Sequence, residues 1–264
     1  MTPGVDEDLA LALRLADAAD EISRAGFTGA AIDHRLKADG SPVSATDVAV
    51  ERRIRALVAE ARPADGMLGE EVGASGPAGR RWIVDGIDGT VLFVAGRRGW
   101  ATEIGLEVDG EVVVGVSTEP VTGRRWWAAR GRGAWLSGPA GGPPSRLAVR
   151  APDGAALAAA PWTVIPPLDA LAGEQRRLAE RLGAAAGAYV PPTEHGALFV
   201  ADGRAAVCLQ TGGGPWDFAA LSVIVAEAGG RFSDLAGRPD IYGGGPALFS
   251  DGRVHDAVVA ALTA

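Results

Sequence analysis

The chain has 264 residues, of which 47% are hydrophobic and 22% charged, so it can bury the core of one large or two small globular domains. Its formal net charge of −8 argues against nucleic acid or an anionic membrane surface as the main partner. Its single cysteine, Cys208, excludes an internal disulfide framework. With no signal-peptide pattern and no long apolar run, we expect a cytoplasmic protein.

The first half of the chain is predicted to contain two helices followed by strands. Apolar spacing predicts helices over 7–25 and over 44–63, where Pro63 marks the end of the second. Residues 80–90, RRWIVDGIDGT, are predicted to form a strand that runs into a glycine-flanked turn. Asp109-Gly110 is typical of a two-residue hairpin turn between strands over 100–120, and 123–138 is expected to add another strand.

The Gly- and Pro-rich segment 137–146 is the expected boundary between two sub-domains, 1–146 and 147–264. Beyond it, the patterns predict strands over 156–165, 204–210, 230–237 and 246–252, and helices over 171–187, 196–203, 215–230 and 253–262. This alternation predicts an α+β protein of layered helices and sheets with mixed strand pairing.

Two acids, Asp85 and Asp88, follow an apolar run at the end of the predicted strand. Unpaired charge is costly there, and neighbouring carboxylates repel each other unless a cation lies between them. A hard divalent ion such as Mg²⁺ takes carboxylates and backbone carbonyls as ligands, which makes both acids and the Ile87 carbonyl candidates. Gly86 and Gly89 allow a tight turn in which backbone N–H groups can approach a phosphate.

The other candidate carboxylates also have ordinary structural explanations. Asp47 completes a helix capping box with Ser44, and Asp217 suits the first turn of its predicted helix. Glu70 and Glu71 can be solvated loop residues. The three histidines are too far apart in sequence to indicate a zinc site, and neither a G-x-S-x-G motif nor a phosphate loop is present.

Three segments together resemble the signatures of the inositol monophosphatase family, whose members are Mg²⁺-dependent and typically lithium-sensitive phosphatases. They are LGEE at 68–71, WIVDGIDGT at 82–90 and WDFAALSVIVAEAGG at 216–230, in the order and spacing of the family. The resemblance runs from about residue 8 to the C-terminus. RRWWAARGRGAW at 124–135 is similar to the bacterial branch that includes inositol-type histidinol-phosphate phosphatases.

This resemblance implies a layered αβαβα sandwich, usually dimeric, that holds two to three Mg²⁺ ions between two sub-domains. The N-terminal sub-domain would carry most of the metal ligands. Glu70, Asp85 and the Ile87 carbonyl would hold the first ion, and Asp85, Asp88 and Asp217 would hold the second. Glu70 would also help to hold a weaker third ion through water.

The resemblance implies that Asp47 and Thr90 activate the attacking water, with Glu70 contributing to catalysis, while the backbone N–H groups of Gly89 and Thr90 bind phosphate. The implied function is a phosphomonoesterase in which a metal-activated water attacks a small hydroxylated metabolite phosphate. The candidate substrates are inositol, histidinol, sugar or nucleoside phosphates. Alternatives are a 3′-phosphonucleotide or fructose-1,6-bisphosphate phosphatase, or a non-catalytic paralogue that binds phosphate esters.

The chain departs from the family pattern at several positions. Gly86 replaces the usual proline, which predicts a less rigid turn with all ligands intact. Gln210 replaces a glutamate with which many relatives contact substrate, and an amide cannot form an ion pair with an ammonium group. Thr193, Glu194 and His195 are alternative specificity candidates, with a loop or helix-start role as the competing explanation.

Overall fold

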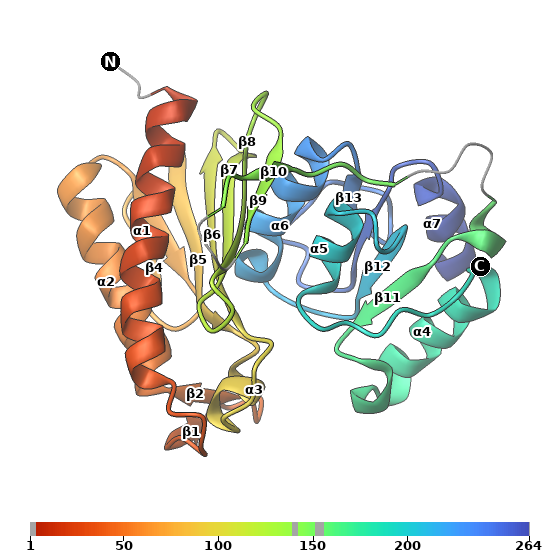
Figure 1. Cartoon of the computed structure of the whole chain (residues 1–264), viewed down its shortest axis with the longest axis horizontal. Coiled ribbons are helices and arrows are strands. Elements are labelled where there is room, and N and C mark those ends of the chain that lie inside the picture. Colours follow the sequence, from red (N-terminus) through yellow and green to blue (C-terminus); the bar gives the residue numbers. More distant parts are fainter. Residues whose placement is uncertain (1–3, 139–141, 151–155, 264) are drawn as a thin grey trace.

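The computed structural model describes residues 4–138, 142–150 and 156–263, and it has the five layers expected of an αβαβα sandwich (Figure 1). The layers are helices α1 (Val5–Gly26) and α2 (Ala45–Ala61), an eight-stranded sheet, helices α5 (Gly196–Ala201) and α6 (Pro215–Glu227), a four-stranded sheet, and helices α4 (Gly173–Ala185) and α7 (His255–Thr263). The predicted α+β class is therefore confirmed.

The larger sheet has the strand order β10-β9-β8-β7-β6-β5-β3-β4, and every pair is antiparallel except β3 with β5. Its strands are β3 (Gly66–Gly69), β4 (Gly73–Ser75), β5 (Arg80–Asp88), β6 (Ala101–Val108), β7 (Glu111–Glu119), β8 (Arg124–Ala129), β9 (Ala134–Ser137) and β10 (Ser145–Arg146). Asp109 and Gly110 both have positive φ, 51° and 85°, as the predicted turn between β6 and β7 requires.

Two glycines let helix α6 lie directly on the larger sheet. A Cβ atom on Gly105 of β6 would lie 2.7 Å from the Ala219 Cβ, and one on Gly115 of β7 would overlap the Ala220 carbonyl. This close approach brings the N-terminal turn of α6 toward the end of β5. The residues of α6 are predominantly buried because the helix packs between the two sheets.

The smaller sheet has the order β11-β12-β14-β13, with β11 and β12 parallel and the other pairs antiparallel. Its strands are β11 (Trp162–Ile165), β12 (Val207–Gln210), β13 (Arg231–Asp234) and β14 (Ala247–Ser250). The strand predicted over 156–165 is shorter than expected, because a 3₁₀ turn at Leu157–Ala159 occupies its first part. A second 3₁₀ turn lies at Leu168–Ala170, and Cys208 is buried in β12.

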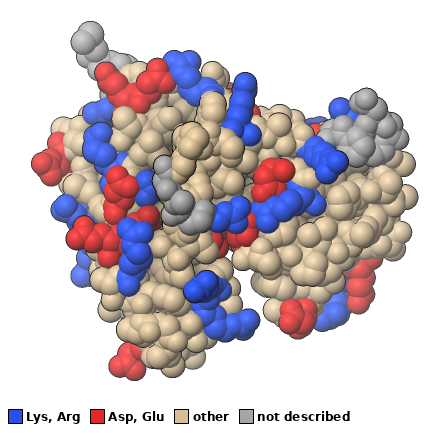
Figure 2. Space-filling view, in the orientation of Figure 1, with Lys and Arg blue, Asp and Glu red and all other residues tan. Residues whose placement is uncertain are grey.

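A short hairpin of β1 (His34–Leu36) and β2 (Pro42–Ser44) lies beside the small helix α3 (Thr90–Val94) at one end of the molecule (Figure 1). In Figure 2 this end is hollowed between the half that carries α3 and the half that carries α4, with basic side chains on the rim. The strand β5 runs toward the same end before it passes into α3 (Figure 1).

The predicted boundary near residue 146 separates the strands of the two sheets along the chain. Helix α6 nevertheless packs on both sheets, so the division into two sub-domains stays a prediction. Among the residues that the structure describes, no helix has the length and apolar character that a bilayer span needs.

Candidate active site

Three carboxylates from two elements converge where β5 ends. One oxygen from each of Asp85, Asp88 and Asp217 lies within 4.8 Å of the others. Strand alternation alone would send residues three apart to opposite faces of a sheet. The register of β5 against β6 shifts between Asp85 and Asp88, and this irregularity lets both acids reach the first turn of α6.

The electrostatics of these three acids indicate a site for a cation. Burial and the charges of Glu70 and Asp88 raise the pKa of Asp85 well above its usual value. Burial, with Glu70 next, raises the pKa of Asp88 to about 6, and burial with Asp88 raises that of Asp217 to about 8. Within the described ranges no Lys or Arg forms an ion pair with them. A compact set of oxygen donors with this unbalanced charge fits a hard divalent ion.

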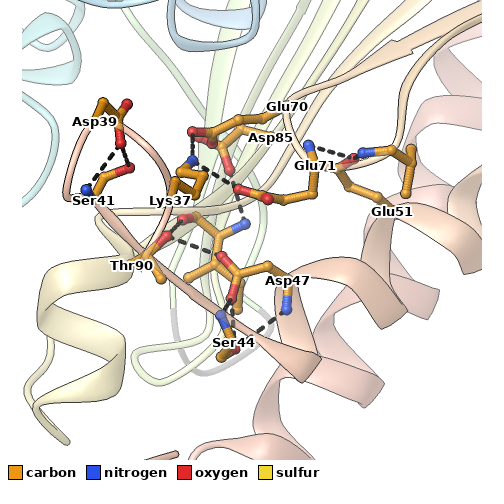
Figure 3. Close-up of polar contacts among 12 residues, drawn as sticks. Lys37, Asp39, Ser41, Ser44, Asp47, Glu51, Glu70, Glu71, Asp85 and Thr90 are labelled. Carbon is orange, nitrogen blue, oxygen red and sulfur yellow. Dashed lines mark hydrogen bonds and ion pairs between the residues drawn. The ribbon is translucent and has the colours of Figure 1, made fainter. Parts of the chain in front are cut away.

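Glu70 lies near this cluster, and a lysine holds its carboxylate. The Lys37 Nζ donates to the Oε1 atoms of Glu70 and Glu71 at 2.6 and 2.8 Å (Figure 3). Burial alone would lower the pKa of Lys37, but the two carboxylates outweigh it and raise that pKa above its usual value. The structure therefore places Glu70 between the acidic cluster and the ammonium group of Lys37.

Asp47 forms the predicted capping box and also contacts Thr90. Its Oδ2 accepts the backbone N–H of Ser44 at 3.0 Å and completes the capping box at the start of α2. Its Oδ1 lies 2.9 Å from the Thr90 Oγ1, which is also 2.8 Å from the Ile87 carbonyl oxygen (Figure 3). The Thr90 hydroxyl has one proton, so it donates to one of these two acceptors at a time. Burial raises the pKa of Asp47.

The two glycines of the turn serve different purposes. Gly89 has φ of 80°, the left-handed region that favours glycine, and its backbone N–H partly offsets the raised pKa of Asp88. Gly86 has no such φ, but a Cβ there would lie 2.8 Å from the Asp47 carbonyl oxygen and 3.2 Å from the Glu51 Cγ. The close approach of α2 therefore gives glycine at 86 a packing reason beyond turn flexibility.

Gln210 ends β12 beside the acidic cluster. Gly213 lies against the side chains of both Gln210 and Asp217. A Cβ atom on it would lie 3.1 Å from the Gln210 Nε2 and 3.0 Å from the Asp217 Oδ2. Buried His195 caps α5, where its Nδ1 accepts the Ala197 N–H at 3.2 Å. Burial lowers the pKa of His195 to about 4, with Gln210 acting in the opposite direction. Within the described part of the chain, neither the His195 Nε2 nor the Gln210 Oε1 has a hydrogen bond of good geometry, although the two side chains lie close enough to influence each other.

Glu194 is held by two guanidinium groups. Its Oε1 accepts from Arg124 Nη1 at 2.7 Å and from Arg204, and its Oε2 accepts from the hydroxyl of Thr193 at 2.9 Å. Burial alone would raise the pKa of Glu194, but the two arginines hold it below its usual range. The helix-start explanation therefore applies to His195, whereas Glu194 belongs to a buried ion-pair cluster.

Three further charged residues near the site were not singled out in the sequence. Lys37 is the only lysine in the chain, a signal that was available. Glu51 follows Asp47 by four residues and so lies on the same face of its helix. Glu103, a buried acid of β6, pairs in register with Asp85, and its Oε1 accepts from Ser117. Burial, with Asp88 next, raises the pKa of Glu103 well above its usual value.

Comparison with known proteins agrees on the family. The model of the inositol monophosphatase family matches residues 5–264. The chain is 41% identical to a histidinol-phosphatase of Mycobacterium tuberculosis over 98% of both chains. It is 40% identical to a Streptomyces griseus protein named glucose-1-phosphate thymidylyltransferase, over 88% of this chain and 87% of that one.

A solved inositol monophosphatase from Zymomonas mobilis has a similar structure, with a TM-score of 0.81 and 27% identity, and the match covers 99% of this chain and 100% of that one. The names of these relatives describe different reactions, so they do not identify a substrate for this chain. The match to the family model nevertheless spans nearly its whole length. This chain therefore belongs to the inositol monophosphatase family, a family of metal-dependent phosphatases.

Proposed function

We propose that this protein is a Mg²⁺-dependent phosphomonoesterase that hydrolyses the phosphate ester of a small hydroxylated metabolite. The observation that carries the proposal is the convergence of Asp85, Asp88 and Asp217 within 4.8 Å, close to the turn that brings Thr90 to Asp47. An acidic cluster of this kind repels a phosphate dianion unless bound cations reverse its charge. Membership of a metal-dependent phosphatase family supports the same conclusion.

Asp85, Asp88 and Asp217 would hold the ions, with Glu70 and the Ile87 carbonyl as further ligands. The donor set consists entirely of oxygen atoms, which suits Mg²⁺. When bound, such ions supply positive charge for the phosphate and Lewis acidity that lowers the pKa of water. Lys37 and a bound metal ion are both cations that require the Glu70 carboxylate, so Lys37 would either share this carboxylate with the ion or release it.

The remaining steps fall to side chains and backbone groups of the chain. The Thr90 hydroxyl can accept a proton from water while it donates its own to Asp47, so the pair can orient the attacking water and remove its proton. Burial makes Asp47 a better proton acceptor because it raises the pKa of that carboxyl. The backbone N–H groups of Gly89 and Thr90, at the start of α3, would bind the phosphate oxygens.

The substrate side of the site favours a neutral, hydroxyl-bearing leaving group. Gln210 and His195 are uncharged, so they present neutral hydrogen-bonding groups on this side of the site. The charge of Glu194 is already matched by Arg124 and Arg204, which leaves it unsuited to binding an ammonium group. Inositol, sugar and nucleoside phosphates fit this chemistry better than histidinol phosphate. Thr193 would contact the substrate from the rim.

A phosphate-release screen tests the proposal. Purified protein with Mg²⁺ is assayed against inositol, histidinol, sugar and nucleoside monophosphates, a 3′-phosphonucleotide and fructose 1,6-bisphosphate. We expect turnover of at least one hydroxyl-rich monoester and its loss on chelation of the metal. No hydrolysis of any ester would leave the non-catalytic binding paralogue as the better description. Light scattering and cell fractionation would test the predicted homodimer and cytoplasmic location.

A further inference from the structure

One face of helix α2 carries three charged side chains at successive helical turns: Asp47, Glu51 and Arg55. Each contacts a segment outside the helix. Asp47 accepts from Thr90, while Glu51 and Arg55 both contact the turn that joins β3 to β4. That turn begins at Glu70, so a single rigid helix contacts both parts of the proposed site.

Glu51 is fully buried, and its carboxylate binds backbone N–H groups. It accepts from Glu71 N at 3.1 Å and from Val72 N at 2.9 Å (Figure 3). In the described part of the chain it forms no salt bridge, so these N–H groups are the partners of its buried carboxyl group, whose pKa burial raises to about 7. The contact is tight, because a Cβ on Gly69 would overlap the Glu51 carboxylate.

Arg55 binds the carbonyl side of the same turn. Its Nη2 donates to the Val72 carbonyl oxygen at 3.0 Å and to that of Gly73 at 2.7 Å. Val72 therefore has its N–H bound by Glu51 and its C=O bound by Arg55. With both backbone groups held from one helix, the turn can neither rotate nor shift along α2 without breaking several hydrogen bonds.

We propose that Glu51 and Arg55 are positioning residues that clamp the turn 70–73 onto α2 and so hold Glu70 at a fixed place relative to Asp47 and the acidic cluster. The inference rests on the proposed function only in so far as Glu70 is a metal ligand. Outer-shell hydrogen bonds that fix a ligand typically contribute about 10–100-fold to metal affinity. The clamp would act through the orientation of Glu70 without contacting the substrate.

The test compares Glu51→Gln and Arg55→Met with two exposed positions of the same helix, Glu60→Gln and Arg52→Met, as matched controls. Mg²⁺ binding is measured by isothermal titration calorimetry well below the melting temperature of each variant. The Mg²⁺ concentration for half-maximal phosphatase activity and the kcat at saturating Mg²⁺ are measured in parallel. Arg55→Met carries the test if Glu51→Gln does not fold, since Arg55 lies at the partly exposed end of the clamp.

We expect about tenfold or greater weakening of Mg²⁺ binding and a matching rise in the half-saturating concentration, with kcat largely restored at saturating Mg²⁺. The control variants should leave both the Mg²⁺ affinity and the half-saturating Mg²⁺ concentration unchanged. A lower melting temperature with an unaltered Mg²⁺ isotherm would overturn the proposal and reduce the clamp to a structural contact. Because calorimetry needs no substrate, an absence of phosphatase activity in wild-type protein would count against the proposed function alone.

Discussion

The Nζ of Lys37 lies 2.6 Å from the Oε1 of Glu70, so the only lysine of the chain supplies positive charge at the edge of the acidic site. The β1–β2 hairpin carries this residue beside the site. A lysine is a compact point charge on a flexible stem, which allows it to leave a carboxylate more readily than a two-pronged guanidinium does.

Replacing this lysine should strengthen metal binding. In Lys37→Gln, Glu70 and Glu71 lose their ammonium partner, and a divalent ion no longer competes with it for Glu70. We expect Mg²⁺ to bind several-fold more tightly by calorimetry, in line with about 1 kcal/mol for a partly exposed ion pair. Arg35→Gln, at an exposed position of the same hairpin, is the control. Weaker Mg²⁺ binding in Lys37→Gln would show that the lysine supports the site rather than competing with the ion.

Asp88→Asn should separate the catalytic role of the cluster from its effect on stability. The amide removes one charge that an ion requires, so kcat should fall by about a hundredfold or more. The same change relieves repulsion with Asp217, so the metal-free protein should melt at a higher temperature than wild type. Asp33→Asn, at an exposed position, should change neither quantity. An unchanged kcat in Asp88→Asn would show that the assigned metal site is wrong.

The metal-free protein should lose stability as the pH rises from about 6.5 to about 8. Asp217 has a pKa raised from 3.8 to about 8, so the stability that its proton contributes is fully present below 3.8, falls as the pH rises, and is gone above about 8. His195 and His255 act in the opposite sense only below about 6.5, because burial lowers both pKa values to about 4. Melting curves should show at most about 1.4 kcal/mol per pH unit per proton.

Saturating Mg²⁺ should reduce this slope, because the ion replaces the proton as the source of positive charge. Asp217→Asn should reduce it without added metal by up to about 1.4 kcal/mol per pH unit, since one proton fewer then titrates. If the stability of the wild-type protein falls equally steeply with pH with and without Mg²⁺, the titrating groups lie outside the acidic cluster.

Adding a side chain at Gly86 should destabilise the protein. A Cβ there approaches the Asp47 carbonyl oxygen to 2.8 Å, and overpacking of this kind costs about 1–3 kcal/mol. Gly86→Ala and Gly86→Pro both introduce this atom, so restoring the usual residue of the family should not stabilise this chain. Gly79→Ala is the control, because its Cβ would meet nothing closer than 3.8 Å. Urea unfolding measures the difference, and a more stable Gly86→Pro would contradict the packing explanation.

Gln210→Glu should shift substrate preference toward esters that carry an ammonium group. The new carboxylate would lie beside His195 in a buried site where Gln210 now presents a neutral amide. We expect the ratio of kcat/KM for histidinol phosphate to that for a neutral polyol phosphate to rise about tenfold at saturating Mg²⁺. Gln175→Glu on α4 adds the same charge at an exposed position and should leave the ratio unchanged. An unaltered ratio in Gln210→Glu would remove this residue from substrate recognition.

Local chemistry explains which features could be predicted from the sequence. The β6–β7 turn follows from Asp109 and Gly110 because few residues adopt positive φ. Helix α6 follows from an apolar run that starts at a proline and ends in glycines. The strand over 156–165 was predicted too long because an alanine-rich run fits a strand, a helix or a 3₁₀ turn equally well, and packing decided between them.

The acidic turn is likewise a local feature, because Asp85 and Asp88 lie on one strand and the register of that strand shifts between them. The sequence alone determined the fold class, the family and the residue types from which a metal site can be built. Only the tertiary structure decided which partner each of them has. Lys37 reaches Glu70 across 33 positions, Thr90 reaches Asp47 across 43, and Glu194 is matched by Arg124 across 70. Such pairs depend on how helices dock on sheets, and apolar spacing specifies that one face is buried without specifying what covers it.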